Sequence, residues 1–223
     1  MREQGVPAKT GIVVAIDGPA GVGKSTLARS LARRLLLPYV NTGMMYRALT
    51  QLALERGISP DDTASLTASA SSIDFSLGAG SPPELLIQGR PPPASLSSRE
   101  VEDSVSAVAA HQEVRTIMRR RQRALGAGGS VMEGRDIGTR VFPDAEVKIF
   151  LAASPGIRGE RRSRQRGGDR LAPAGVRMRD ELDSRTTPFE PAPDAAVIDT
   201  TLRSPSEVLE TSIRIVSRRL GDR

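Results

Sequence analysis

The sequence contains no cysteine and no tryptophan, and aromatic residues make up only 3% of its 223 residues. Without cysteine, the chain can form neither disulfide bonds nor thiolate metal sites. Its apolar runs are far shorter than the roughly 18 residues of a membrane-spanning helix, and residues 1–9 lack the apolar region of a secretory signal. We therefore expect a soluble, cytoplasmic protein that does not enter a membrane.

Lysine is also scarce, although the chain is basic and carries a net charge of +6. The only lysines are Lys9, Lys24 and Lys148, so arginine supplies nearly all of the positive charge. Arginine binds phosphate through two hydrogen bonds at once, which favours a site for phosphorylated ligands. A nucleic-acid-binding surface and biased codon usage with solvated arginines are the alternatives.

A glycine-rich segment near the N-terminus is the most informative part of the chain. Residues 18–26 read GPAGVGKST and fit G-x-x-x-x-G-K-[ST] between a strand-like apolar run and a helical pattern. Glycines let the backbone turn tightly against a ligand, and successive N–H groups at a helix N-terminus bind anions. Lys24 can reach the β- and γ-phosphates of a nucleoside triphosphate, and the Ser25 hydroxyl can bind Mg²⁺. The triphosphate is expected on Gly18, Pro19, Ala20, Gly21, Val22, Gly23, Lys24, Ser25 and Thr26.

Short apolar runs alternate with helical patterns along the chain. This alternation predicts an α/β fold of three layers, with a five-stranded parallel sheet between helices. The candidate strands are 12–16, 38–40, 130–133, 147–151 and 196–199. The candidate helices begin at Lys24, Gly43, Glu100, Pro155 and Pro205. Such sheets bind ligands at the carboxyl ends of their strands, where the glycine-rich loop and residues 133–136 lie.

Two segments interrupt the alternation. Runs at 73–77 and 84–88, with turn residues between them, predict a small antiparallel sheet inserted in the parent fold. Residues 155–175 are rich in arginine, and they form either a solvated helix with a loop or a mobile lid; the presence of a phosphate-binding loop favours the lid. We expect a flexible N-terminus (1–9), a P-loop core (10–57 and 105–223), an inserted subdomain (58–104) and a lid (155–175).

The residues after the second strand predict another anion site. Residues 41–47 read NTGMMYR and bring together a hydroxyl, a helix N-terminus, a phenol and a guanidinium, which Arg135 can complete. Asn41 is the only asparagine, so the guanine-reading Asn-Lys-x-Asp motif of GTPases is absent. Two facing phosphate sites favour an enzyme that moves a phosphoryl group between them.

The sequence resembles the bacterial cytidylate (CMP) kinases, which are nucleoside-monophosphate kinases, over nearly its whole length. The matching segments are 16–26, 42–47, 134–139, 141–145, 179–184, 194–195 and 198–201. The first indicates only a P-loop, whereas the second and third together are specific. The resemblance implies transfer of the γ-phosphoryl group of ATP to CMP or dCMP with Mg²⁺. We expect a monomer that binds neither nucleic acid nor membrane. The rivals are another P-loop kinase, for UMP, AMP or shikimate, and an ATP-regulated nucleic-acid-binding module.

The resemblance places the phosphate of the acceptor on Arg47 and Arg135, with Thr42 and Tyr46 nearby. Catalysis is expected to need no general base, because the attacking group is already a phosphate oxygen, and to depend on positioning and charge neutralisation. The cations expected for this are Lys24, Arg135 and the lid residue Arg162.

The resemblance places the cytosine on Ser106, Arg115 and Asp136. Arg115 can donate to the acceptors of the base, and Asp136 can accept from its amino group, which uracil lacks. The alternative for Ser106 is an exposed hydroxyl on a helix.

The sugar hydroxyls are expected on Arg179 and Asp183, although this pair also has the spacing of a surface ion pair. The family carries a further phosphate-binding arginine three residues later, where this chain has Thr186. Arg185 or a lid arginine is expected to replace it. Asp17 beside the loop either orients waters of Mg²⁺ or caps the loop.

Overall fold

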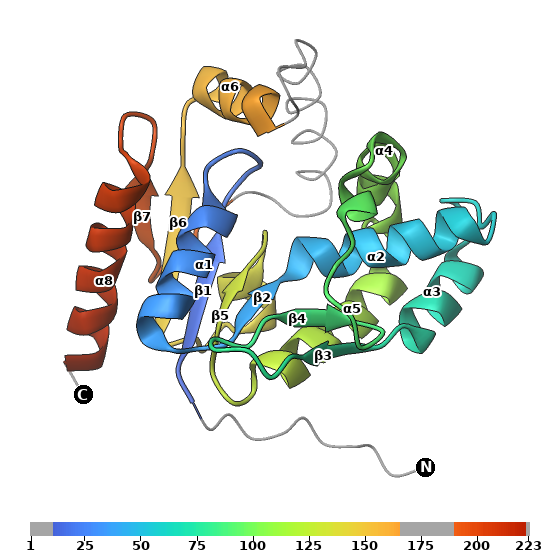
Figure 1. The fold of residues 1–223 in the computed structure, drawn as a ribbon, viewed down its shortest axis with the longest axis horizontal. Coiled ribbons are helices and arrows are strands. Elements are labelled where there is room, and N and C mark those ends of the chain that lie inside the picture. Colours follow the sequence, from blue (N-terminus) through green and yellow to red (C-terminus); the bar gives the residue numbers. More distant parts are fainter. Residues whose placement is uncertain (1–10, 166–189, 222–223) are drawn as a thin grey trace.

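The computed structural model describes residues 11–165 and 190–221. Figure 1 shows a central sheet between helices, with a smaller sheet beside it. The predictions for residues 1–9, for Arg179, Asp183 and Arg185, and for residues 166–175 of the expected lid lie outside the described residues.

The central sheet has five strands in the order β2-β5-β1-β6-β7, and each neighbouring pair is parallel. The strands are β1 (Val13–Asp17), β2 (Tyr39–Asn41), β5 (Ser130–Glu133), β6 (Val147–Ala152) and β7 (Ala196–Asp199). The predicted five-stranded parallel sheet is confirmed. Because β1 is flanked by β5 and β6, the carboxyl ends of β1, β5 and β2 meet at one edge, and this edge positions the site.

Helices cover both faces of the sheet (Figure 1). They are α1 (Lys24–Leu35), α2 (Thr42–Glu55), α3 (Thr63–Ser72), α4 (Arg99–Val108), α5 (Gln112–Gly126), α6 (Pro155–Gln165) and α8 (Pro205–Gly221). The predicted starts at Lys24, Pro155 and Pro205 are confirmed, and α2 and α4 each begin one residue before the predicted start. The sequence patterns did not predict α3 or a separate α5. Among the described residues, none of the helices combines the length and the apolar character needed to cross a bilayer.

Successive residues of β1 face opposite sides of the sheet, as the pleat of a strand requires. Val13 and Ala15 belong to one hydrophobic cluster, together with side chains of α2, α3 and α5. Val14 and Ile16 belong to another, together with side chains of α1 and α8. All four are fully buried. The predicted three-layer arrangement is therefore confirmed, with one hydrophobic layer on each face.

A second, antiparallel sheet consists of β3 (Phe75–Leu77) and β4 (Leu85–Ile87), which confirms the predicted inserted pair. It is followed by a short helix, η1 (Ala94–Ser97), and by α4. The start of β2 is hydrogen-bonded to this hairpin, because the Tyr39 N–H donates to the Pro83 carbonyl at 2.8 Å. Residues Phe75 and Leu85 belong to the same cluster as Val13. The inserted segment therefore shares the hydrophobic core of the parent fold, and its boundaries at 58 and 104 stay a prediction.

Candidate active site

The loop between β1 and α1 has the backbone geometry that the glycine-rich motif predicts. Gly18 and Gly21 adopt positive φ angles of 143° and 78°. A Cβ at Gly18 would lie 2.3 Å from the Leu151 carbonyl oxygen, and one at Gly21 would lie 2.7 Å from the Arg158 carbonyl oxygen. Only glycine fits these two positions, because a side chain would be strained by the φ angle and would collide with backbone. Lys24 folds back over the loop and donates through Nζ to the carbonyls of Gly18 and Pro19, both at 2.7 Å.

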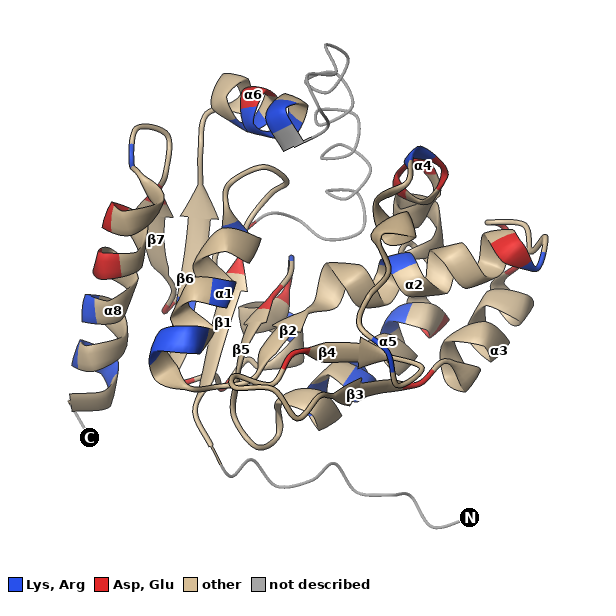
Figure 2. Cartoon of the chain, viewed as in Figure 1, with Lys and Arg blue, Asp and Glu red and all other residues tan. Residues whose placement is uncertain are grey.

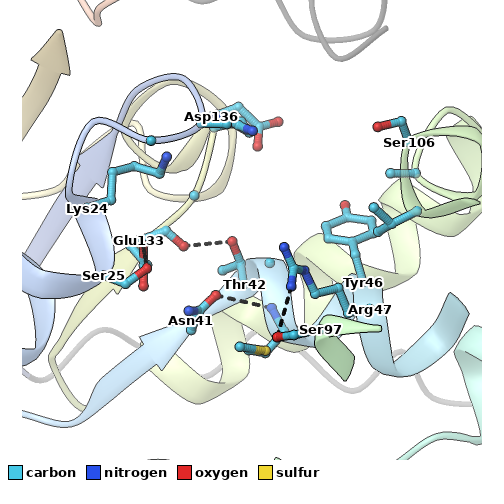
Figure 3. A pocket seen from close by; sticks show the side chains of 18 of the residues that line it. Lys24, Ser25, Asn41, Thr42, Tyr46, Arg47, Ser97, Ser106, Glu133 and Asp136 are labelled. Carbon is cyan, nitrogen blue, oxygen red and sulfur yellow. Dashed lines mark hydrogen bonds between the residues drawn. The ribbon is translucent and has the colours of Figure 1, made fainter. Parts of the chain in front are cut away.

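A cavity of about 400 Å³ lies between this loop and the helices α2 and α4. It brings together most of the predicted site residues that the structure describes, from both halves of the expected site. Those that line it are Ala20, Gly21, Gly23, Lys24, Ser25, Thr26, Thr42, Tyr46, Arg47, Ser106, Arg115, Arg135, Asp136 and Arg162. The predicted residues Gly18, Pro19 and Val22 belong to the same loop but do not line the cavity. Figure 3 shows Lys24 and Ser25 on one side of the cavity, and Tyr46 and Ser106 on the other.

The residues predicted for the acceptor phosphate come from α2 and from the end of β5. Asn41 caps α2, since its side-chain oxygen accepts from the Met44 N–H at 3.1 Å. Thr42 donates through Oγ1 to the Glu133 carbonyl at 2.7 Å, which fixes the start of α2 to β5. Arg135 donates through Nη1 to the Gly18 carbonyl at 2.8 Å, so it lies directly on the glycine-rich loop.

Tyr46 and Arg47 stand on the first turns of α2. Burial raises the pKa of the Tyr46 hydroxyl to about 12, so this phenol stays protonated at neutral pH and can donate a hydrogen bond. Arg47 donates to the Leu96 carbonyl at 3.3 Å and pairs with Glu102 of α4, with 3.2 Å between Nη2 and Oε1. Arg162 of α6 contacts the same carboxylate oxygen. The predicted acceptor and lid arginines therefore meet at one carboxylate.

The predicted base-reading pair is already in contact. Arg115 of α5 donates through Nη2 to Asp136 Oδ2 at 2.7 Å, and its Nη1 lies 3.3 Å from the Ala109 carbonyl. Arg119, one turn further along α5, also reaches Asp136 Oδ2, at 3.3 Å. Ser106 lies half-buried on α4 at the edge of the cavity, and not on an exposed face. The sequence did not single out Arg119, although its position four residues after Arg115 on a helix places it on the same face.

Glu133 is a functional candidate that the sequence prediction missed. Its buried carboxylate accepts from Ser25 Oγ at 2.9 Å and from the Tyr39 hydroxyl at 2.5 Å. Asn41 donates through Nδ2 to the same phenol oxygen at 3.2 Å. Burial raises the pKa of Tyr39, so its hydroxyl remains a donor. A hydrogen-bonded chain therefore connects the glycine-rich loop with the start of α2. The sequence signal that could have pointed to Glu133 is an acidic residue at the end of a predicted buried strand.

Asp17 holds the segment after β5 in place. Its two carboxylate oxygens accept from the backbone N–H groups of Ile137 and Gly138, at 2.8 and 2.7 Å. These residues begin η2 (Ile137–Val141), directly after Arg135 and Asp136. Burial raises the pKa of Asp17 to about 6, although the two N–H donors oppose the shift. Of the two roles considered for Asp17, the geometry favours the structural one.

The residues around Ser25 suit Mg²⁺ better than a softer metal. A hydroxyl and a carboxylate supply oxygen ligands, which Mg²⁺ prefers, and Mg²⁺ commonly takes its other ligands from water and substrate phosphates. Among residues 11–165 and 190–221, no three acidic or histidine side chains gather into a protein-only metal site. A metal at Ser25 would therefore depend on a bound nucleotide for part of its coordination.

A profile of the cytidylate kinase family matches residues 14–218. The bifunctional pantoate ligase/cytidylate kinase of Synechococcus sp. (strain JA-2-3B'a(2-13)) is 46% identical over 95% of this chain and 41% of its own length. The cytidylate kinase of Geobacillus kaustophilus is 43% identical over 96% of this chain and 100% of its own, and that of Bacillus licheniformis is 41% identical over 93% and 97%. The chain thus spans about two-fifths of the bifunctional relative and nearly all of the other two.

Proposed function

The chain belongs to the cytidylate kinase family, and we propose that it transfers the γ-phosphoryl group of ATP to CMP or dCMP, which yields ADP and CDP or dCDP. The observation that carries the proposal is the cavity between the glycine-rich loop and α2, which is lined by phosphate-binding groups on both sides. A cavity of about 400 Å³ can hold the acceptor nucleotide against the terminal phosphate of a donor. Family membership and geometry therefore support the same reaction.

The acceptor is held at three points in this proposal. Arg47 and Arg135 bind its phosphate, with Thr42 and Tyr46 as further donors. Asp136 accepts from the amino group of cytosine, and Arg115 donates to the ring nitrogen or the carbonyl. The contact between Arg115 and Asp136 supports this role, because each side chain fixes the orientation of the other before the base arrives.

The donor lies on the other side, with its phosphates on the amides of residues 18–26. A second cavity of about 410 Å³ borders the same loop and is lined by Arg161, Thr200 and Arg203, among others. We assign it to the nucleoside part of ATP. Thr200 ties this region to the loop, because its Oγ1 donates to the Val22 carbonyl at 3.0 Å. Ser25, with Glu133 behind it, would hold Mg²⁺, which neutralises charge on the β- and γ-phosphates when bound.

The chemistry in this proposal depends on position and charge. The acceptor phosphate oxygen is already an anion, so the chain needs no general base to activate it. Lys24 leaves the carbonyls of Gly18 and Pro19 and binds the transferring group, where its ammonium offsets the developing charge. Arg135 links the two sides, since it extends from the end of β5 onto the loop. Arg162 supplies a further cation from α6, and closure around the nucleotides would exclude the water that hydrolyses ATP.

We further propose that the protein acts as a monomer in the cytoplasm on free nucleotides. The lining of the cavity supports the binding of free nucleotides, because Arg47, Arg115 and Arg135 all border this one cavity. On α8, which lies away from the cavity, the acidic residues lie in the first half of the helix and the basic residues in the second half, so no basic stripe runs along the whole helix (Figure 2).

The test is a coupled assay of ADP release with CMP, dCMP, UMP, AMP and shikimate as acceptors. We expect turnover with CMP or dCMP well above the others, and higher rates with AMP or UMP would refute the proposal. In the variant Asp136→Ala, the preference for CMP over UMP should fall by roughly 10- to 100-fold, since a polar group that reads the base is lost. Asp144→Ala, which changes an exposed carboxylate after η2, is the matched control and should keep the preference.

A further inference from the structure

Glu102 is a buried carboxylate that contacts two of the candidate arginines at once. Its side chain is only 5% exposed, and the side chains of Arg47 and Arg162 are 11% and 20% exposed. Both guanidinium groups contact the same oxygen, Oε1. The three residues come from α4, α2 and α6, so one carboxylate joins the inserted segment, the acceptor helix and the first helix of the expected lid.

The contact of Glu102 with Arg47 and Arg162 resembles the way in which arginines bind a phosphate. Guanidinium groups bind phosphate oxygens through the same charge-assisted hydrogen bonds that they form with carboxylates. Here a carboxylate oxygen of the chain itself takes that place. Arg47 and Arg162 both line the cavity, and Glu102 lies behind them on the first turn of α4. An acceptor phosphate that enters the cavity therefore meets arginines that already have an anionic partner.

We propose that Glu102 is an internal anion that competes with the acceptor phosphate for Arg47 and Arg162, and thereby sets the affinity for the acceptor. This inference rests on the proposed function. On binding, the phosphate takes over the two arginines from Glu102. Part of the binding free energy is spent on breaking the ion pairs, so the acceptor binds less tightly than two uncommitted arginines would bind it.

The competition also has a positioning effect. Two guanidinium groups close together repel each other, and the carboxylate between them holds both near the place of the phosphate before substrate arrives. Glu102 is thus expected to lower affinity without lowering the rate of transfer. Its effect should fall on the binding of the phosphate group alone, because the base-reading residues Arg115 and Asp136 lie elsewhere in the cavity.

The experiment compares CMP with cytidine, which lacks the phosphate, as ligands for the full chain in calorimetric titrations. In Glu102→Gln, which keeps the size of the side chain and removes its charge, we expect the Kd of CMP to fall about tenfold, or 1.4 kcal/mol. The Kd of cytidine should stay the same. Glu100→Gln removes an exposed carboxylate from the same turn of α4 and should change neither value. In steady-state assays, KM for CMP should fall in Glu102→Gln while kcat changes less than about twofold.

A cycle with Arg162→Ala separates competition from simple repulsion between Glu102 and the phosphate. If Glu102 acts by occupying the arginines, Glu102→Gln should improve the binding free energy of CMP less than about half as much in the Arg162→Ala background as in the unmodified chain. A full gain in that background would overturn the inference, as would a weaker or unchanged Kd of CMP in Glu102→Gln, or an equal change for cytidine.

Glu102→Asp keeps the charge and is the second variant. It should bind CMP within about threefold of the unmodified chain, and thermal melting of every variant shows whether it is folded. If the unmodified chain binds CMP but does not phosphorylate it, the proposed function fails while the titrations still decide the role of Glu102.

Discussion

The hydroxyl of Tyr39 should stabilise the fold through Glu133, and the substitution Tyr39→Phe tests this. The phenol is buried and donates to a carboxylate oxygen at 2.5 Å. Removing the hydroxyl leaves a buried charged acceptor with one donor fewer. Hydrogen bonds to charged groups contribute about 1.5–3 kcal/mol. We therefore expect Tyr39→Phe to lower the free energy of unfolding by about 2 kcal/mol, which for a chain of this size corresponds to a fall in Tm of roughly 4–8 °C.

The assignment to Glu133 requires a double-mutant cycle, measured by urea unfolding. In the Glu133→Gln background the acceptor is neutral, and the same hydroxyl should contribute only about 1 kcal/mol. The two substitutions should therefore be coupled by about 1 kcal/mol or more. Tyr46→Phe is a matched control, because that half-buried phenol is paired with the neutral amide of Gln122. It should cost about 1 kcal/mol and show no coupling to Glu133. Additivity of Tyr39→Phe and Glu133→Gln within roughly 0.3 kcal/mol would refute the reasoning.

Three other substitutions test the glycine-rich loop and the residues that hold it. Lys24→Ala should lower kcat by about 10²- to 10³-fold, with melting temperature nearly unchanged, because its ammonium serves the transferring group; a loss smaller than tenfold in the ADP-release assay would contradict this role. Ser25→Ala should raise the Mg²⁺ concentration needed for half-maximal rate, and an unchanged Mg²⁺ titration would place the metal elsewhere. The raised pKa of Asp17, about 6 against 3.8, means that the folded state holds this proton more tightly, so its stabilising contribution is complete below pH 4 and is lost as the pH rises through 6. Unfolding at pH 5 and 7 should therefore show a steeper loss of stability for the unmodified chain than for Asp17→Asn, and parallel pH profiles would refute the assignment.

The parallel sheet could be predicted from the sequence because its central strands β1, β5 and β6 are buried on both faces and appear as short apolar runs. The glycine-rich loop could also be predicted, since Gly18, Gly21 and Lys24 belong to one short motif, although the backbone of Leu151 and Arg158 that the loop packs against could not. The second anion site, at residues 41–47 with Arg135, was predicted from the residues themselves, whereas Ser106, Arg115 and Asp136 were predicted through the family resemblance. Their placement in one cavity follows from strand order, which brings the ends of β1, β5 and β2 to one edge.

The contacts that connect distant elements could not be predicted in this way. Glu133 and Tyr39 meet because β2 pairs with β5, and the sequence of neither strand determines the register of that pair. Glu102 has no motif of its own, and on its helix it resembles the exposed Glu100 and Asp103. Glu102 is buried because α4 packs against α2 and because the side chain of Arg162 extends from α6 to the Glu102 carboxylate. α3 escaped prediction because small polar residues dominate its sequence, and its stability depends on contacts with α2 and α5.

The position of β1 has a consequence for synthesis on the ribosome. β1 comes first along the chain, yet both of its neighbours, β5 and β6, lie more than a hundred residues later. A nascent chain that has emerged only to the end of α4 carries the glycine-rich loop next to a strand with neither neighbour. Pairing between segments so distant in sequence is slow, and exposed strand edges promote aggregation. The interval before β5 and β6 emerge is therefore when this chain would benefit most from a chaperone.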